Sequence, residues 1–220
     1  MWRLGDYELS KLLILGAGGH GKAVADAAMA TGSWSGIAFL DSNKNLKEVL
    51  GFPIVGGIDD YTLFLERFPA AFVAIGHNKT RLLWLEKLEQ AGFQIPTIIH
   101  PASTISRFSS IGSGSIVMAG VVVNAATTIG EGCILNTSSS IDHDCVVEKG
   151  VHISPGVNVS GTVSIKSYTW LGVGAKVSNN ITIGSNVTVA AGAVVINNVS
   201  DHVMVAGVPA KIKKDFGDER

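Results

Sequence analysis

The sequence has few cysteines, few aromatic residues and almost no net charge. Of its 220 residues two are cysteines, 7% are aromatic and 16% are charged, and the formal net charge is −1. This charge predicts neither a nucleic-acid partner nor an anionic membrane surface. No apolar run approaches the roughly 20 residues that span a bilayer, and the apolar run at residues 11–15 is too short for a signal peptide. These absences favour an ordinary globular chain in the cytoplasm.

The two cysteines do not predict a disulfide. Cys133 and Cys145 both fall in a column of small residues that belongs to the repeat described next. We interpret them as buried structural thiols, in preference to a disulfide pair or a nucleophile. A reducing cytoplasm is consistent with that interpretation.

The most extensive pattern in the chain is an aliphatic residue at every sixth position. Neither a helix, with its period of 3.6, nor a simple strand, with its period of 2, requires such a return. Hexapeptide repeats are typical of a parallel β-helix, a solenoid whose coils bury their apolar faces by stacking. The series comprises Ile105, Ile111, Val117, Val123, Ile129, Leu135, Ile141, Val147, Ile153, Val159, Ile165, Leu171, Val177, Ile183, Val189 and Val195.

Two further columns keep the same phase. Small or β-branched residues such as Ser115, Thr127 and Cys133 stand four positions after the aliphatic residue and fit a narrow interior. The column three positions after it holds residues that tolerate positive φ at a corner. Each hexad is therefore predicted to be a short strand followed by a corner. The corner column includes Gly114, Gly120, Gly132, Gly150, Gly156, Gly174, Gly192, Asn180, Asn186 and Asn198.

The pattern changes near residue 97, which predicts two domains, residues 1–97 and 98–220. The first part reads as half of a doubly wound nucleotide-binding fold. Its predicted elements are strands at 11–15, 36–40 and 71–75, a glycine-rich turn at 16–22, and helices at 23–30 and 79–91.

A nucleotide site is predicted at the end of the first strand. The spacing of Gly16, Gly18 and Gly21 meets the dinucleotide fingerprint, and Asp41 stands where a ribose-binding acid would. A phosphate at the following helix N-terminus is physically sensible. Because about 97 residues hold one mononucleotide half, a single nucleotide such as a UDP-sugar fits better than NAD. Tight glycine packing without a ligand is the alternative.

One corner of the repeat differs from the glycine, asparagine and serine corners. His143 follows the aliphatic Ile141 by two residues, so its side chain is expected to point outward, and Asp144 follows it. An exposed imidazole beside a carboxylate can act as a general base near neutral pH. A solvated corner histidine without a catalytic role is the alternative. Gly161 lies one coil later, where its N–H could serve as an oxyanion donor.

These motifs together resemble a known family. Residues 16–22, GAGGHGK, then residues 74–78, AIGHN, and Arg81, ahead of the hexapeptide repeat, resemble bacterial nucleotide-sugar and sialic acid acetyltransferases. The likeness spans about residues 11–211 and is nearest to UDP-4-amino-sugar N-acetyltransferases of the UDP-N,N′-diacetylbacillosamine type. It implies a left-handed β-helix, although the general crossover rule favours the right hand. It also implies acetyl-CoA as donor, a UDP-amino-sugar as acceptor, a role in glycan biosynthesis, and a homotrimer with CoA between adjacent β-helices.

The resemblance also implies roles for individual residues, with no metal site among them. His143 is the expected catalytic base, oriented by Asp144 and supported by Asn136. The substrate-binding residues are expected to be Gly16, Gly18, Gly19, His20, Asp41, Asn78 and Arg81, and the cofactor-binding residues His152, Gly161, Val173, Ala191, Gly207, Pro209 and Lys211.

Other functions remain open at this point. A sialic acid O-acetyltransferase and a GDP-amino-sugar N-acetyltransferase would differ from the UDP-amino-sugar enzyme only in the acceptor. A non-catalytic nucleotide-sugar-binding module would tolerate loss of His143. Zinc carbonic anhydrases use the same solenoid but need three histidine ligands, and only His143 and His152 fall well within the coils.

Overall fold

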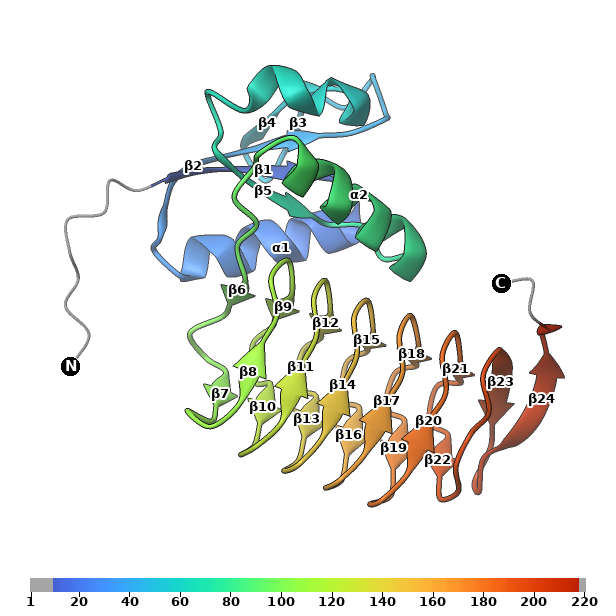
Figure 1. Ribbon diagram of the computed structural model, residues 1–220. Coiled ribbons are helices and arrows are strands. Elements are labelled where there is room, and N and C mark those ends of the chain that lie inside the picture. The colour runs from blue at the N-terminus through green and yellow to red at the C-terminus, as the bar shows by residue number, and fades with distance from the viewer. Residues whose placement is uncertain (1–9, 218–220) are drawn as a thin grey trace.

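The computed structural model describes residues 10–217, which form a small α/β domain placed against one side of a long coil of short strands (Figure 1). The coil is a left-handed parallel β-helix, as the hexapeptide pattern and the resemblance predicted. Within residues 10–217, no helix is long and apolar enough to cross a membrane.

The N-terminal domain is built on a five-stranded sheet with the order β3-β4-β2-β1-β5. All its pairs are parallel except β3 with β4. Leu12, Ile14, Phe39 and Phe72 are buried in its core. Its elements are β1 (Ser10–Leu15), α1 (Gly19–Ala30), β2 (Trp34–Leu40), β3 (Glu48–Val49), β4 (Phe52–Gly56), the 3-10 helix η1 (Ile58–Phe64), β5 (Ala70–Val73) and α2 (Asn78–Gln90).

Two details of this domain differ from the sequence prediction. Helix α1 begins at Gly19, inside the stretch expected to be a turn. Gly21, in its first turn, packs against the carbonyl of Gly16, where no Cβ could fit. Residues 48–64, for which no element was predicted, form β3, β4 and η1. The three predicted strands and the second helix are present, with shifted ends.

The β-helix has three faces, each a stack of short strands. The six-stranded face contains β7 (Thr104–Ile105), β10 (Val122–Val123), β13 (Ser140–Ile141), β16 (Asn158–Val159), β19 (Lys176–Val177) and β22 (Val194–Val195). The five-stranded face contains β8 (Ser110–Ile111), β11 (Thr128–Ile129), β14 (Val146–Val147), β17 (Ser164–Ile165) and β20 (Thr182–Ile183). The eight-stranded face contains β6 (Ile98–Ile99), β9 (Ile116–Val117), β12 (Ile134–Leu135), β15 (His152–Ile153), β18 (Trp170–Leu171), β21 (Thr188–Val189), β23 (Val203–Ala206) and β24 (Lys211–Asp215).

The register of the coil repeats every 18 residues, as in the pairing of Ile134 with His152. The aliphatic series points inward and is buried from Val117 to Val195. Corner residues adopt positive φ whether they are glycine or not, for example Gly132 at 59° and Asn180 at 58°. The expectation for Asn198 is wrong: its φ is not positive, and its side chain instead accepts the Thr182 N–H at 2.8 Å. The regular repeat has ended there, and β23 follows.

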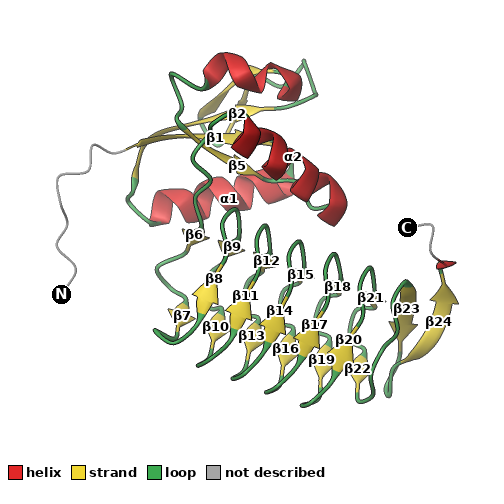
Figure 2. Ribbon diagram, viewed as in Figure 1, coloured by secondary structure: helices red, strands yellow, loops and turns green. Residues whose placement is uncertain are grey.

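Helix α2 joins the two domains by packing on one corner of the coil, between the five-stranded and eight-stranded faces. Glycines stand at this corner in three successive coils, Gly114, Gly132 and Gly150. A Cβ on any of them would meet Leu82 or Leu85 of α2. Helix α1 runs between the N-terminal sheet and the coil (Figure 2). The N-terminal domain therefore covers this corner and part of the eight-stranded face.

Candidate active site

His143 lies on the corner between β13 and β14, and its ring is exposed. Its Nδ1 is 2.8 Å from Oδ2 of Asp144, and both side chains are 58% exposed. Asp144 occupies the corner position with positive φ, 57°, which an aspartate tolerates better than most residues. The hydrogen bond to Asp144, with the charge of Asp142, raises the pKa of His143 above 6.5. The ring is thus a strengthened base that is open to solvent.

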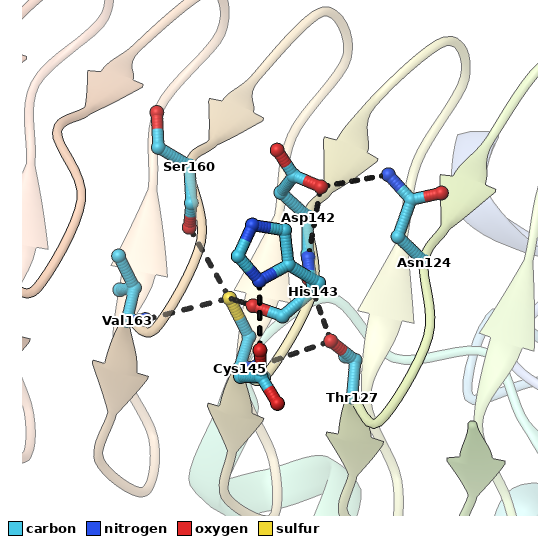
Figure 3. A network of polar contacts seen from close by, with 8 residues as sticks. Asn124, Thr127, Asp142, His143, Cys145, Ser160 and Val163 are labelled. Carbon is cyan, nitrogen blue, oxygen red and sulfur yellow. Dashed lines mark hydrogen bonds and ion pairs between the residues drawn. The ribbon is translucent and has the colours of Figure 1, made fainter. Parts of the chain in front are cut away.

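The neighbouring coils complete this corner (Figure 3). Asp142 accepts hydrogen bonds from the His143 N–H and from the Asn124 amide, both at 2.9 Å. On the other side, a Cβ built on Gly161 would lie only 2.6 Å from Cε1 of His143. Glycine at 161 therefore makes room for the imidazole. The sequence singled out Gly161 but not Asp142 or Asn124, although the 18-residue spacing places Asn124 beside Asp142.

The glycine loop lies at the start of α1. Gly16 has φ of 100°, and Gly18 is the N-cap without a side-chain cap. Nothing lies within 4 Å of a Cβ built on Gly18 or Gly19. The first N–H groups of a helix have no intrahelical partner, so this open N-terminus can receive an anion. Asp41 holds the loop by accepting the Ala17 N–H at 2.7 Å, and it also accepts the Asn43 N–H at 2.8 Å.

Two histidines, His20 of the glycine loop and His152 of β15, lie close enough to affect each other's charge. Burial and Arg81 lower the pKa of His20 to about 4. Burial, Arg81 and His20 lower the pKa of His152 to about 3. Both rings are therefore neutral at pH 7, and in each the Nε2 atom is buried without a hydrogen-bond partner among the described residues. His152 also stacks on Trp170, with ring centroids 6.1 Å apart, a contact that the sequence analysis missed.

Arg81 does not have the role predicted for it. The side chain is fully buried, and its five N–H groups are already used. Nε donates to the Gly132 carbonyl at 2.7 Å, and Nη2 donates to the Gly150 carbonyl and to Asn78 Oδ1. Nη1 donates to the carbonyls of residues 75 and 76. No donor is left for a substrate, so we correct the prediction: Arg81 ties α2 to the coil.

Asn78 shares in this junction while it also borders a cavity. Its amide donates to the Tyr168 carbonyl at 2.8 Å. The cavity has a volume of about 800 Å³ and opens between the start of α2 and the eight-stranded face, with His152, Trp170 and Met204 among its lining residues. A second cavity of about 570 Å³ borders Asp41 and Gly56 in the N-terminal domain.

The remaining predicted residues follow the corner between the eight-stranded and six-stranded faces. Asn136 comes directly after β12, and its Oδ1 accepts the Thr137 N–H at 2.8 Å. Val173 and Ala191 occupy the same corner in later coils and are exposed. Gly207 and Pro209 form the exposed turn between β23 and β24, and Lys211 begins β24. These residues form one row along the coil.

One chain does not bring all the predicted residues together. His143, Asp144 and Gly161 share a corner between the five-stranded and six-stranded faces. That corner is opposite the eight-stranded face, on which His152 and the N-terminal domain lie. The glycine loop and the row from Asn136 to Lys211 are therefore separated from His143 within the chain.

A β-helix of hexapeptide repeats that carries an exposed, carboxylate-paired histidine at a corner defines the class of hexapeptide-repeat acyltransferases. Comparisons with known proteins narrow this class. Residues 11–88 match the family model of the PglD N-terminal domain. UDP-N-acetylbacillosamine N-acetyltransferase of Bacillus subtilis (strain 168) is 33% identical over 127 residues, a match that spans 50% of this chain and only about half, 52%, of that relative.

Solved structures match over nearly the whole chain. The acetyltransferase domain of PglB from Neisseria gonorrhoeae FA1090 is 42% identical, with a TM-score of 0.86 over 92% of this chain and 98% of that one, and it has also been solved with acetyl coenzyme A. A histidine-to-asparagine mutant of perosamine N-acetyltransferase from Caulobacter crescentus, in complex with CoA and GDP-perosamine, is 37% identical. Its TM-score is 0.90, and the match covers 94% of this chain and 98% of that one. The chain belongs to the bacterial nucleotide-sugar N-acetyltransferase family.

Proposed function

We propose that this protein transfers the acetyl group of acetyl-CoA to the 4-amino group of a UDP-linked amino-deoxy sugar. The exposed His143 ring, paired at 2.8 Å with Asp144, is the observation that carries this proposal. As the amine attacks the thioester carbonyl, a C–N bond forms and the C–S bond breaks. His143 takes the proton from the amine and returns it to the departing CoA thiolate. The Gly161 N–H is proposed to stabilise the developing oxyanion.

The nucleotide sugar is proposed to lie along the carboxyl edge of the N-terminal sheet. Asp41 follows β2, the glycine loop follows β1, and Gly76 follows β5, in the spatial order of the strands. The cavity beside Asp41 would take the nucleotide base, and the open N-terminus of α1 at Gly18 and Gly19 the diphosphate. The sugar would then reach the coil near His20 and His152. Asp41→Ala is accordingly expected to weaken nucleotide-sugar binding without weakening acetyl-CoA binding.

The donor is proposed to lie along the outer corner row. Val173, Ala191 and the turn at Gly207 are exposed along this corner, with the half-buried Asn136 two coils ahead of Val173, and Lys211 adds a positive charge near the end of the row. The acetyl group would be placed at His152, whose neutral ring can donate or accept a hydrogen bond.

A homotrimer is part of the proposal. Because His143 lies on the corner opposite the face that carries the N-terminal domain, we infer that His143 of one copy acts on the sugar held by another. Cyclic symmetry makes every such interface equivalent, so three copies would form three identical sites.

A GDP-linked 4-amino-sugar is the second candidate acceptor. The relative bound to CoA and GDP-perosamine matches 94% of this chain. We favour the UDP-linked sugar because residues 16–22 and 76–78 resemble that branch, and because the curated relative is named for a UDP-linked substrate.

Release of free thiol from acetyl-CoA tests the proposal, with a UDP-4-amino-sugar, a GDP-4-amino-sugar and sialic acid offered in parallel. We expect rapid turnover with the UDP-linked amine. His143→Ala is expected to lower kcat by roughly 10²- to 10⁴-fold, the usual effect of losing a general base, while acetyl-CoA still binds. Unchanged turnover in this variant would show that His143 is not the base. Turnover only with the GDP-4-amino-sugar or with sialic acid would show that the acceptor is that compound and not a UDP-linked sugar.

A further inference from the structure

Asp142 is placed between His143 and the preceding coil in a way that the repeat does not require. Its Oδ1 accepts the backbone N–H of His143 at 2.9 Å and the Nδ2–H of Asn124 at 2.9 Å, as Figure 3 shows. Asn124 comes from the coil before, directly after β10. One carboxylate oxygen therefore links the residue that carries the imidazole to the neighbouring coil.

The carboxylate occurs only in the coil that holds His143. The same corner position is occupied in the other coils by Ser106, Asn124, Ser160 and Ser178, and after β22 by Ile196. Short polar side chains at such positions bond to nearby backbone N–H groups and shape the local turn. An uncharged residue would serve that purpose, so a negative charge at this one position calls for another explanation.

The charged groups that act on the His143 ring are Asp142 and Asp144. The adjoining coils contribute Asn124 and Gly161, which carry no charge. The hydrogen bonds from His143 and Asn124 lower the pKa of Asp142, with a smaller opposing effect of burial, so Asp142 remains ionised while His143 titrates. The imidazole of His143 is thus in direct contact with the carboxylate of Asp144, while the carboxylate of Asp142 contacts the backbone N–H of the same residue.

We propose that Asp142, anchored by Asn124, is a positioning residue for His143. Asp142 holds the corner from which the imidazole projects, and it supplies a second negative charge beside the ring. This rests on the proposed role of His143 as the base. During acetyl transfer the amine proton moves to His143 and leaves an imidazolium, which then protonates the CoA thiolate. Asp142 stabilises that imidazolium without exchanging a proton itself.

Three substitutions separate charge from geometry. Asp142→Asn keeps an oxygen that can accept both N–H groups but removes the charge. Asp142→Ala removes the charge and the anchor, and Asn124→Ala keeps the charge while removing its support. Asp201→Asn is the matched control, because the Asp201 carboxylate also accepts a corner N–H, that of Ser185 at 2.7 Å, outside the His143 corner.

The full-length variants would be compared by NMR titration of the His143 imidazole and by kcat and KM across pH. Asp142→Asn is expected to lower the imidazole pKa and to move the acid limb of kcat to lower pH. Its plateau kcat is expected to fall roughly 3- to 10-fold, with KM for both substrates changed less than about 2-fold, because a charge felt in the transition state has been removed. Asp142→Ala is expected to lose more activity than Asp142→Asn. Asn124→Ala is expected to lose less activity than Asp142→Asn.

The proposal is overturned if Asp142→Asn leaves both the titration and the acid limb of the wild type unchanged while His143→Ala abolishes turnover. It is also overturned if Asp201→Asn shifts the titration as much as Asp142→Asn does, since any corner carboxylate would then suffice. Full activity of His143→Ala would instead refute the proposed function itself, because the base would lie elsewhere. The titration does not depend on turnover, so the two failures can be told apart.

Discussion

His143 gains its basicity from the residue that follows it. A general base must be unprotonated to accept the amine proton, and the hydrogen bond to Asp144 favours the protonated ring. Activity is therefore lost as the pH falls through a pKa that is raised above 6.5. We expect the acid limb of kcat to have its midpoint above pH 6.5 in the wild type.

Asp144→Asn tests this origin of the basicity. Asparagine tolerates the positive φ of residue 144, so the corner is kept while the charge is lost. The acid limb is expected to move to lower pH, and kcat on the plateau to fall roughly 10- to 100-fold, because the imidazolium formed in the reaction loses its partner. A limb that stays at the wild-type pH would show that Asp144 does not set the basicity of the catalytic group.

The sequence allowed the exposed histidine to be predicted but not the buried arginine. His143 follows the aliphatic Ile141 by two residues, so its outward direction followed from the repeat alone. The role of Arg81 depends on carbonyls that lie 51 and 69 residues further along the chain. Nothing local in the sequence shows that α2 would pack on those carbonyls, and the family resemblance implied a substrate contact for this helical arginine.

Among the elements, α2 is the one that holds the N-terminal domain on the β-helix. Arg81 of α2 places a fully buried guanidinium between the domains, and burial lowers its pKa to about 10, so that it is still charged at pH 7. Arg81→Met would leave the carbonyls of Gly132 and Gly150 without these donors. We expect a loss of about 3–5 kcal/mol in the free energy of unfolding, the scale of breaking a buried hydrogen-bonded charge network.

Denaturant unfolding and limited proteolysis would measure this effect. The N-terminal domain is expected to become sensitive to protease in Arg81→Met before the coil does, and Arg81→Lys is expected to recover part of the stability at most. A stable, protease-resistant Arg81→Met protein with a selective loss of nucleotide-sugar affinity would restore the original prediction of substrate contact.

The corner glycines under α2 carry a separate prediction. Gly132 and Gly156 have φ of 59° and 67°, but only Gly132 lies against a side chain of α2, that of Leu82. Gly156→Ala is expected to cost about 1–2 kcal/mol for its left-handed backbone alone. Gly132→Ala should cost more, by roughly 1 kcal/mol, because Leu82 must also move. Equal losses in urea unfolding would show that the packing of α2 on this corner contributes nothing to stability.

The elements were predictable where the repeat is strict and less so elsewhere. The aliphatic series predicted each short strand of the coil from Ile105 to Val195, because one spacing fixes the position of every strand. Residues 48–64 were missed, since two of their elements are a two-residue strand and a 3-10 helix, which have too few residues to show a period.

At the scale of the whole molecule, the separation of His143 from the glycine loop predicts a site shared by neighbouring copies. His143→Ala and Gly19→Asp should each be inactive alone, the second because its carboxylate opposes the diphosphate. The whole population of trimers from equal co-expression should regain roughly a quarter of the wild-type activity per site, because each proposed site draws its base and its loop from different copies.

Thiol release by the co-expressed proteins, after light scattering has measured their mass, provides the check. Proteins mixed after separate assembly serve as the control, since without subunit exchange they should stay inactive. If the protein is a trimer and co-expression recovers no activity, the base and the loop of one chain lie in the same site. If the protein is a monomer, the shared site is refuted altogether.

The constant 18-residue register gives the β-helix a fixed unit of length. Each coil advances the chain by about 4.8 Å along the axis, so the number of coils between His152 and the turn at Gly207 would fix how long a donor on the proposed track can be held at both ends. Removal of one complete coil would shorten that span by one step while every remaining side chain kept its face. On the proposed donor track, the length of donor that fits would therefore change only in steps of one whole coil.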